Sequence, residues 1–175
     1  MSQTDAISGE LRAMLAGIDR AQSTAAATQH EAEQVAAKAA AAGFTGIAAG
    51  MTQVREAIRD LQARLNSAGG SVNDASAAVA AVPKEASPAE VITALTRVTD
   101  KIDTAHQGVG SSVSRVDETR TLVTRVLQGG DPGPLLSMLG TIKEILTSVA
   151  QRGGVAKQTL TTAVNDARRM GNSGN

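Results

Sequence analysis

The residues best suited to acid–base or metal chemistry in this sequence are two histidines, His30 and His106. His30 has Glu31 and Glu33 close by, but on a helix these two carboxylates point in different directions, so they do not converge on one ion. If the helices carrying the histidines run parallel at an offset of 84 residues, His106 lies level with Gln22. Gln22 and His30 are eight residues apart, so the two histidine rings are then separated by about 12 Å along the helix axis. We expect two solvent-facing histidines and no metal site.

Other routes to catalysis lack their residues. The chain has no Cys, which excludes a thiol nucleophile and a cysteine-ligated metal. It contains no Glu-x-x-His pair of the kind that holds metals in helical bundles. The glycine-rich segments 43–46 and 129–134 lack the lysine of a phosphate-binding loop. The sequence therefore predicts no catalytic, cofactor-binding or metal-binding residue, and a protein that is not an enzyme.

Charge and composition exclude further classes of function. The 175 residues carry 17 basic and 17 acidic side chains and a single aromatic residue, which argues against a nucleic-acid binder. No stretch approaches 18 uninterrupted apolar residues, so no integral membrane segment is expected. Residues 1–10 lack the basic start of a secretory signal. We expect a cytoplasmic protein, or one exported without a cleavable signal peptide.

Apolar residues that could form a core recur in alternating steps of four and three, the pattern of a heptad seam. Three runs span residues 7–42, 47–82 and 91–126, with breaks at 43–46, at Pro83 and at 129–134. The fourth run is interpreted as Leu135, Met138, Ile142, Ile145 and Val149, followed by weaker positions at Ala156, Thr159 and Ala163. The glycine pair at 69–70 is expected to kink or split the second helix, because each Gly costs about 1 kcal/mol relative to Ala.

Two helix starts have clear local signals. In Ser87-Pro88-Ala89-Glu90, Ser87 can cap the helix while Glu90 reaches back to close a capping box. Before the fourth helix, Asp131 is placed to cap and Pro132 to occupy the first helical position.

Four long helices joined by short breaks predict an all-α fold, an elongated antiparallel four-helix bundle or coiled coil. It would consist of two tandem helical hairpins, residues 1–86 and 87–171, which form one bundle, with a disordered tail at 172–175. A shift of 84 residues places Gly46 on Gly130 and the glycine pair 69–70 on 153–154, which favours a tandem duplication. Residues 1–88 hold 25 of the 32 alanines, so the first hairpin is expected to depend on packing against the second.

The fourth helix has apolar residues outside its predicted seam, namely Leu136, Leu139 and Leu146. Two interpretations remain open. The helix is buried on two sides of the bundle, or this second stripe is an exposed surface that docks another chain.

The break at Phe44-Thr45-Gly46 resembles the Trp-x-Gly turn of the WXG-type helical hairpins of type VII secretion, with Phe44 in place of Trp and Gly46 as the matching Gly. The second half keeps Gly130 but has no aromatic residue, and the chain lacks the Tyr of that family's export signal. The whole chain also looks like members of an actinobacterial family of unknown function. The resemblance to the WXG-type hairpins implies that the chain acts as a secreted substrate or as a partner module. Phe44 is expected to pack beneath the turn, with a role in recognition as the alternative.

These observations lead to three hypotheses of function. The first is a non-enzymatic helical interaction protein, a partner, adaptor or chaperone associated with a type VII-like secretion or toxin system. The second is a self-assembling scaffold or filament subunit, since an open contact between rods propagates. The third is a helical bundle that sequesters a small molecule. The expected partner is another helical protein or a second copy of the chain, and the candidate interaction residues are Phe44, Gly46, Leu136, Leu139 and Leu146.

Overall fold

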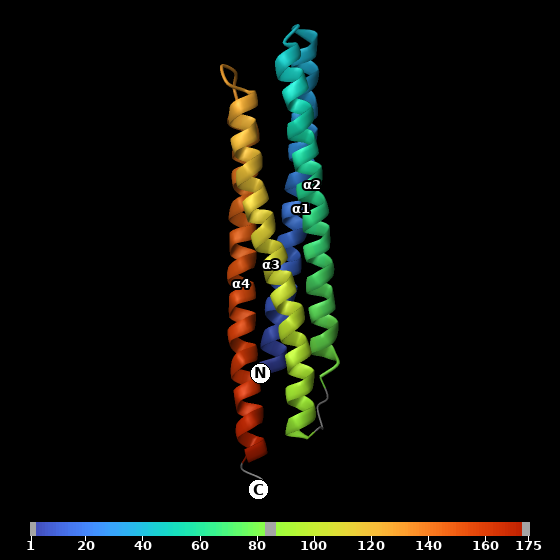
Figure 1. The fold of residues 1–175 in the computed structure, drawn as a ribbon, viewed down its shortest axis with the longest axis vertical. Helices are drawn as coiled ribbons and strands as arrows, with labels where there is room; N and C mark the ends of the chain where they lie inside the picture. Colours follow the sequence, from blue (N-terminus) through green and yellow to red (C-terminus); the bar gives the residue numbers. More distant parts are fainter. Residues whose placement is uncertain (1–2, 83–86, 173–175) are drawn as a thin grey trace.

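A computed structural model describes residues 3–82 and 87–172, which form four long helices. They are α1 (Gln3–Ala41), α2 (Thr45–Ala80), α3 (Pro88–Val126) and α4 (Gly133–Asn172). Each helix contacts two neighbours, in the cyclic order α1, α2, α3, α4 and back to α1. Figure 1 shows the helices running up and down along one elongated body. The predicted antiparallel four-helix bundle is confirmed.

The core follows the heptad seams of the first three helices. On α1, α2 and α3 almost every predicted seam residue is buried, and the exceptions lie at helix ends. The core residues of α3 and α4 are mostly isoleucine, leucine and valine, whereas α1 contributes alanines at 21, 25, 32 and 39. Small side chains bury little apolar area, so this part of α1 gains less from burial than the other helices do.

On α4 the buried stripe differs from the predicted one. Leu139 and Leu146 are fully buried, whereas Met138 and Ile145, which the prediction placed in the seam, are only half-buried. The buried residues follow strict heptad steps: Leu135, Leu139, Ile142, Leu146, Val149, Gly153, Ala156, Leu160, Ala163 and Ala167. Every second residue of the observed seam thus lies one position later than predicted. The predicted phase would bury Arg152 in the C-terminal half of the helix, whereas the observed phase buries Gly153.

Two glycines with positive φ turn the chain at the loop end of the two hairpins. Gly43 has φ +81° and Gly129 has φ +92°, a backbone conformation that favours glycine. The α1–α2 connection is only residues 42–44, so Gly46, expected in the break, already lies in the first turn of α2. The α3–α4 connection is longer, residues 127–132.

The glycine pairs at 69–70 and 153–154 do not split their helices, since α2 and α4 run through them without interruption. Nor are the two pairs equivalent in packing. Gly153 is buried in the α4 seam, whereas Gly70 is exposed on α2. The match of breaks at a shift of 84 residues is thus not a match in packing. Relative to that shift from α2, α4 begins four residues later, three from the longer loop and one from the later end of α3.

The start of α3 is as predicted, whereas α4 begins at Gly133, so Pro132 precedes the helix rather than occupying its first position. The Ser87 hydroxyl accepts a hydrogen bond from the Glu90 N–H, and the Glu90 carboxylate accepts one from the Ser87 N–H at 2.9 Å, so the capping box is confirmed. Asp131 Oδ1 accepts a bond from the Gly133 N–H at 3.0 Å. At the far end, Gly171 and Asn172 belong to α4 rather than to a tail, and residues 173–175 lie outside the described part of the chain, as does Pro83.

Three hydroxyl-bearing residues occupy core positions, Thr28, Ser112 and Thr119. Each hydroxyl donates to the carbonyl four residues earlier on its own helix, at 2.7, 2.9 and 2.8 Å respectively. A buried hydroxyl is costly when it lacks a partner, and these three have one within the helix.

Candidate functional site

The α1–α2 hairpin extends beyond the α3–α4 hairpin at the loop end of the bundle. Gly50 of α2 faces Val126, the last residue of α3, and a β-carbon at Gly50 would lie 2.6 Å from the Val126 Cγ1. On α1, Gly17 faces Val149 of α4. Counting outward from that pair, α1 reaches about eight residues beyond the start of α4, or about 12 Å at 1.5 Å per residue.

The two hairpins are thus staggered along the rod, and at the opposite end of the bundle the α3–α4 hairpin extends beyond the α1–α2 hairpin (Figure 1). There the Gln3 amide donates to Asp166 at 2.8 Å, and α4 continues for six more residues to Asn172. Gly171 contacts Pro88 at the start of α3, so the second hairpin projects at this end. Figure 1 shows both steps, with the α1–α2 turn reaching furthest at the top and α3 and α4 reaching furthest at the bottom.

We call residues 39–50 the tip; it contains the α1–α2 turn. Burial is incomplete along the end of the α1 seam, where Val35 is half-buried, Ala39 is still buried and Ala42 is exposed. At the turn, Phe44 is 60% exposed. It precedes α2 as its N-cap residue, and its side chain makes no capping hydrogen bond. The expectation that Phe44 packs beneath the turn is wrong, because the hairpin projects too far for α3 and α4 to cover it.

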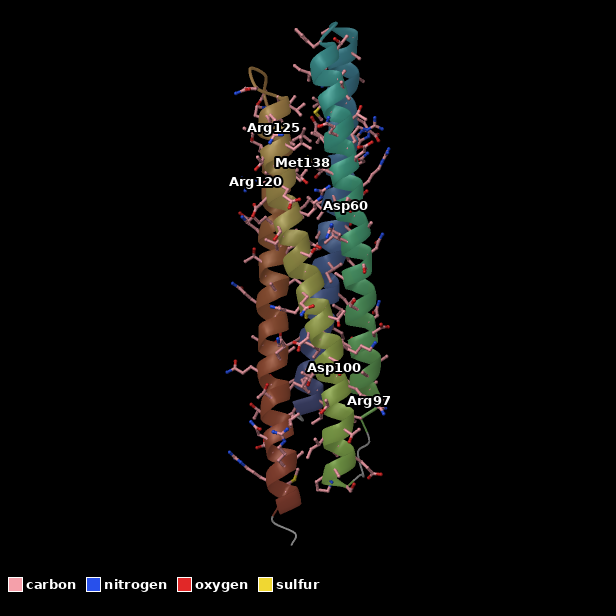
Figure 2. The ribbon with its side chains drawn as sticks, in the orientation of Figure 1. Asp60, Arg97, Asp100, Arg120, Arg125 and Met138 are labelled. Atoms are coloured by element: carbon pink, nitrogen blue, oxygen red, sulfur yellow. The ribbon has the colours of Figure 1, made fainter. Side chains whose placement is uncertain are left out.

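The loop end of the bundle is poor in charge. Residues 39–54 contain no charged side chain, and residues 126–142 contain only Asp131, which caps α4. On α3, Arg125 lies in the last turn and Arg120 about one turn further from this end (Figure 2). The opposite end carries Glu90 in the first turn of α3 and Arg168 and Arg169 near the end of α4. The two ends of the rod therefore differ in surface chemistry.

The candidate interaction residues fall into two groups. Phe44 and Gly46 lie exposed at the tip, and open space surrounds the position that a β-carbon on Gly46 would take. Leu139 and Leu146 lie in the core, and Leu136 is half-buried and packs against that core. The structure therefore brings the first pair to one surface and leaves no exposed leucine stripe on α4. Extending the heptad count to the end of α4 would have shown that Leu139 and Leu146 belong to the seam.

The histidines lie in different environments. His30 is exposed and its Nε2 is 2.9 Å from Gln34 Nε2. His106 is half-buried, and its Nδ1 has no hydrogen-bond partner. The ring lies against Gly153, where a β-carbon would be 2.8 Å from Nδ1 and 3.3 Å from the Met14 methyl group. His106 is therefore level with Met14 rather than Gln22, and it is not solvent-facing. Within residues 3–82 and 87–172, no three His, Asp or Glu residues cluster to hold a metal ion.

A network of charged side chains ties α2 to α3 along the flank of the rod. Asp60 accepts from Arg64 Nε at 2.9 Å and pairs with Arg115 Nε at 2.8 Å. The hydrogen bond from Arg64 lowers the pKa of Asp60, and the charges of Arg64 and Arg115 act in the same direction. Arg64 also donates to Ser111 at 2.7 Å. Because the Asp60 carboxylate is 41% exposed, this network adds modest stability.

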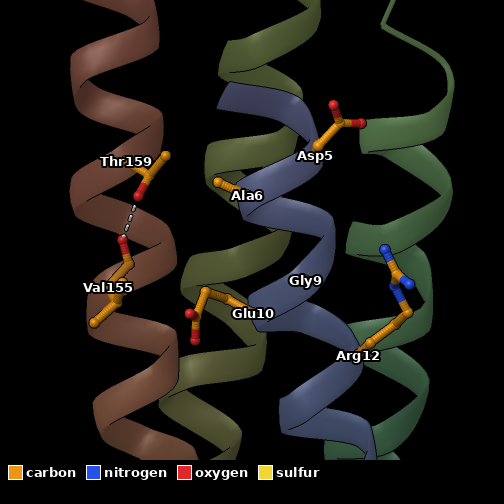
Figure 3. A pocket seen from close by; sticks show the side chains of 7 residues that line it. All are labelled: Asp5, Ala6, Gly9, Glu10, Arg12, Val155 and Thr159. Carbon is orange, nitrogen blue, oxygen red and sulfur yellow. Dashed lines mark hydrogen bonds between the residues drawn. The ribbon is translucent and has the colours of Figure 1, made fainter. Parts of the chain in front are cut away.

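A hollow of about 590 Å³ lies over Gly9 between α1 and α4. Figure 3 shows Ala6 and Glu10 on the side of α1 that faces α4, where Val155 and Thr159 complete the lining, while Asp5 and Arg12 lie on the other side. The hollow is open to solvent, and a β-carbon at Gly9 would meet no atom within 4 Å. Glu10 is engaged with Arg152 of α4 at 3.2 Å. The hollow is therefore a shallow surface depression and not a pocket into which polar groups converge.

In the described residues, the large apolar side chains that are exposed are those of Phe44 at the tip and of Val155 and Met170 on α4. Of these, Phe44 lies in a stretch without charged residues. Among the described residues, no helix is both long and apolar enough to span a bilayer. Residues 86–172, which contain the second hairpin, match the model of a family described as Family of unknown function (DUF6244). No curated protein and no solved structure matches the chain.

Proposed function

We propose that this chain is a non-enzymatic interaction protein that binds another helical protein through the tip of its α1–α2 hairpin. One observation carries the proposal: Phe44, the single aromatic residue of the chain, is 60% exposed where the α1–α2 hairpin projects beyond α3 and α4 (Figure 1). Large apolar side chains held at a projecting and uncharged surface are typical of contact sites.

Small residues around Phe44 support a helical partner. Ala40, Ala41, Ala42, Gly46 and Ala49 are all exposed at the tip. Short side chains let the backbone of a second helix approach closely, while long charged chains at the same positions would have to be displaced or desolvated. A partner that offers an apolar groove between helices fits this surface best.

A role as partner, adaptor or chaperone of a type VII-like secretion or toxin system is the biological setting that we propose for this contact. It rests on the resemblance of Phe44-Thr45-Gly46 to the turn of the WXG-type hairpins. The hollows described above and between α2 and α3 lie on the surface, so a bundle that sequesters a small molecule has less support than an interaction protein.

The proposal is tested with the full-length chain carrying a photo-crosslinking side chain at position 44 or, as a control, at position 170. Met170 is a suitable control because it is 64% exposed and lies at the opposite end of the rod. In cells of the native host, position 44 is expected to crosslink to a defined helical protein that position 170 does not capture. Identical crosslinking patterns at both positions, or no product at position 44, would contradict the proposal. If the captured protein belongs to a type VII-like system, the proposed setting is supported as well.

A further inference from the structure

We infer that the partner at the tip is a second copy of this chain, bound end to end about a two-fold axis, so that two rods form one longer rod. This inference rests on the proposed function, because it uses the same surface and names its occupant. The observation behind it is the stagger between the two hairpins, which leaves a step at the loop end of the bundle.

The step has the shape that a second copy requires. The projecting part of α1 and α2 reaches beyond α3, α4 and the loop of residues 127–132 that joins them (Figure 1), so the position beyond that loop has no neighbour within the chain. If a second molecule is inverted end over end, its own projecting tip fits that position. Both molecules have the same step height, so each tip reaches the end of the other's α3–α4 hairpin. Such a contact is isologous and closed, and it ends at two copies.

The faces that would meet are apolar on both sides. Val35 of α1 and Ile47 of α2 continue the core seams into the tip but are only half-buried within one chain. A second tip laid against them would replace the α3–α4 hairpin that the first tip lacks. Phe44 of each copy would then lie against the α3–α4 loop of the other, where Gly129 and Gly130 are exposed. The charged residue of that loop, Asp131, is exposed and accepts a hydrogen bond from the Gly133 N–H.

Charge favours this arrangement over a head-to-tail chain of rods. In a head-to-tail contact the tip would meet the opposite end of the next molecule, which carries the exposed side chains of Arg168 and Arg169. Arg169 is paired with Asp166 at 3.9 Å, and covering the two arginines with an uncharged surface would cost desolvation energy without a new ion pair in return. The two-fold contact covers fewer charges, since residues 39–54 contain none and the loop of residues 127–132 carries only Asp131.

The overlap is short, about 12 Å along the rod, so the association is expected to be weak and to depend on concentration. Light scattering on the full-length chain should show a rise from 17.8 kDa toward twice that mass as the concentration increases from micromolar to millimolar. Small-angle X-ray scattering should show the maximum dimension of the particle nearly doubling, because the copies overlap only at their tips.

Phe44→Ser is the decisive variant, and Met170→Ser is its matched control. Serine is a favoured N-cap residue, so Phe44→Ser is expected to keep the bundle folded. The dissociation constant of the dimer should rise at least about tenfold in Phe44→Ser, which corresponds to about 1.4 kcal/mol, and stay unchanged in Met170→Ser. Phe44→Trp supplies a reporter, since the chain contains no Trp, and its fluorescence should shift to shorter wavelength as the dimer forms.

Three results would overturn the inference. These are a monomer at every concentration, a dimer that Phe44→Ser does not weaken, and a ladder of species larger than two copies. A monomeric chain that still crosslinks another protein through position 44 would remove the second copy as partner but leave the proposed function standing. Loss of both the dimer and the crosslink would remove the two together.

Discussion

Three glycines allow side chains of a neighbouring helix to reach the helix backbone. Gly17 receives Val149, Gly50 receives Val126, and Gly153 receives the ring of His106. At each position a β-carbon would come closer to the neighbouring side chain than ordinary van der Waals contact permits. These glycines therefore set the distance between α1 and α4, between α2 and α3, and between α3 and α4.

Gly17→Ala is predicted to destabilise the bundle, because the new methyl group would collide with Cγ2 of the buried Val149. Overpacking of this kind costs about 1–3 kcal/mol. Gly9→Ala is the matched control on the same helix, since open space surrounds its β-carbon position. It should stabilise the bundle by about 0.5–1 kcal/mol, the usual gain of Ala over Gly in a helix. Urea unfolding followed by circular dichroism at 222 nm measures both, and equal shifts would contradict the packing argument.

Asp60→Asn is predicted to reduce stability at neutral pH and to have no effect in strong acid. Arg64 and Arg115 lower the pKa of Asp60 in the folded state, so its contribution is present above the ordinary carboxyl pKa of about 4. The contribution is lost as the pH falls through the lower folded-state value. At 41% exposure we expect roughly 0.2–1 kcal/mol. Unfolding at pH 7 and pH 2 tests this, with Asp19→Asn on exposed α1 surface as control; a difference that persists at pH 2 would refute it.

At the scale of the helix, local signals were readable where one short motif determines the outcome. The capping box of Ser87 and Glu90 was predictable because it needs only two side chains three residues apart. The α4 seam was harder, because Met138 and Leu139 are both apolar and either one continues the pattern from Leu135. The choice becomes clear only at Arg152 and Gly153, where one phase would bury a charge and the other buries a glycine.

Ser87→Ala is predicted to weaken the start of α3. The variant loses the hydroxyl that accepts from the Glu90 N–H, a loss that typically costs about 1 kcal/mol. For a chain of this size the melting temperature should fall by about 2–4 °C. Ser114→Ala is the control, because Ser114 is an exposed mid-helix residue of α3 whose hydroxyl bonds only within the helix. The interpretation fails if both variants lower the melting temperature equally in a calorimetric scan.

At the scale of the whole molecule, the sequence predicted four antiparallel helices but not their relative heights. Heptad seams fix which face of a helix is buried, yet they repeat every seven residues, so the helices can slide by a heptad without changing the pattern. Glycine contacts such as Gly17 with Val149 and Gly50 with Val126 decide among these positions. The exposure of Phe44 follows from that stagger, which is why it could not be predicted from the residues around it.

Fragments of the chain are predicted to differ in their ability to fold. Residues 1–82 should be far less helical than the same residues in the whole chain, because much of the α1 seam is alanine and buries little area. Residues 87–172 carry more Val, Leu and Ile in their seams and should retain more helix. An equimolar mixture should regain helicity beyond the sum of the parts by circular dichroism. A fully helical, monomeric fragment 1–82 would show that the first hairpin is independent.

The contact between α1 and α4 has a consequence for how fast the bundle forms and comes apart. The Gln3 amide and Asp166 are 163 residues apart in sequence, whereas each hairpin closes across a turn of only three or six residues. The entropy lost on closing a loop rises with its length, so the second hairpin should form first around Gly129, and α1 should pack against α4 late in folding. We therefore expect interactions between α1 and α4, such as that of Glu10 with Arg152, to form late. They govern how long a folded molecule survives, and have little influence on how quickly it is made.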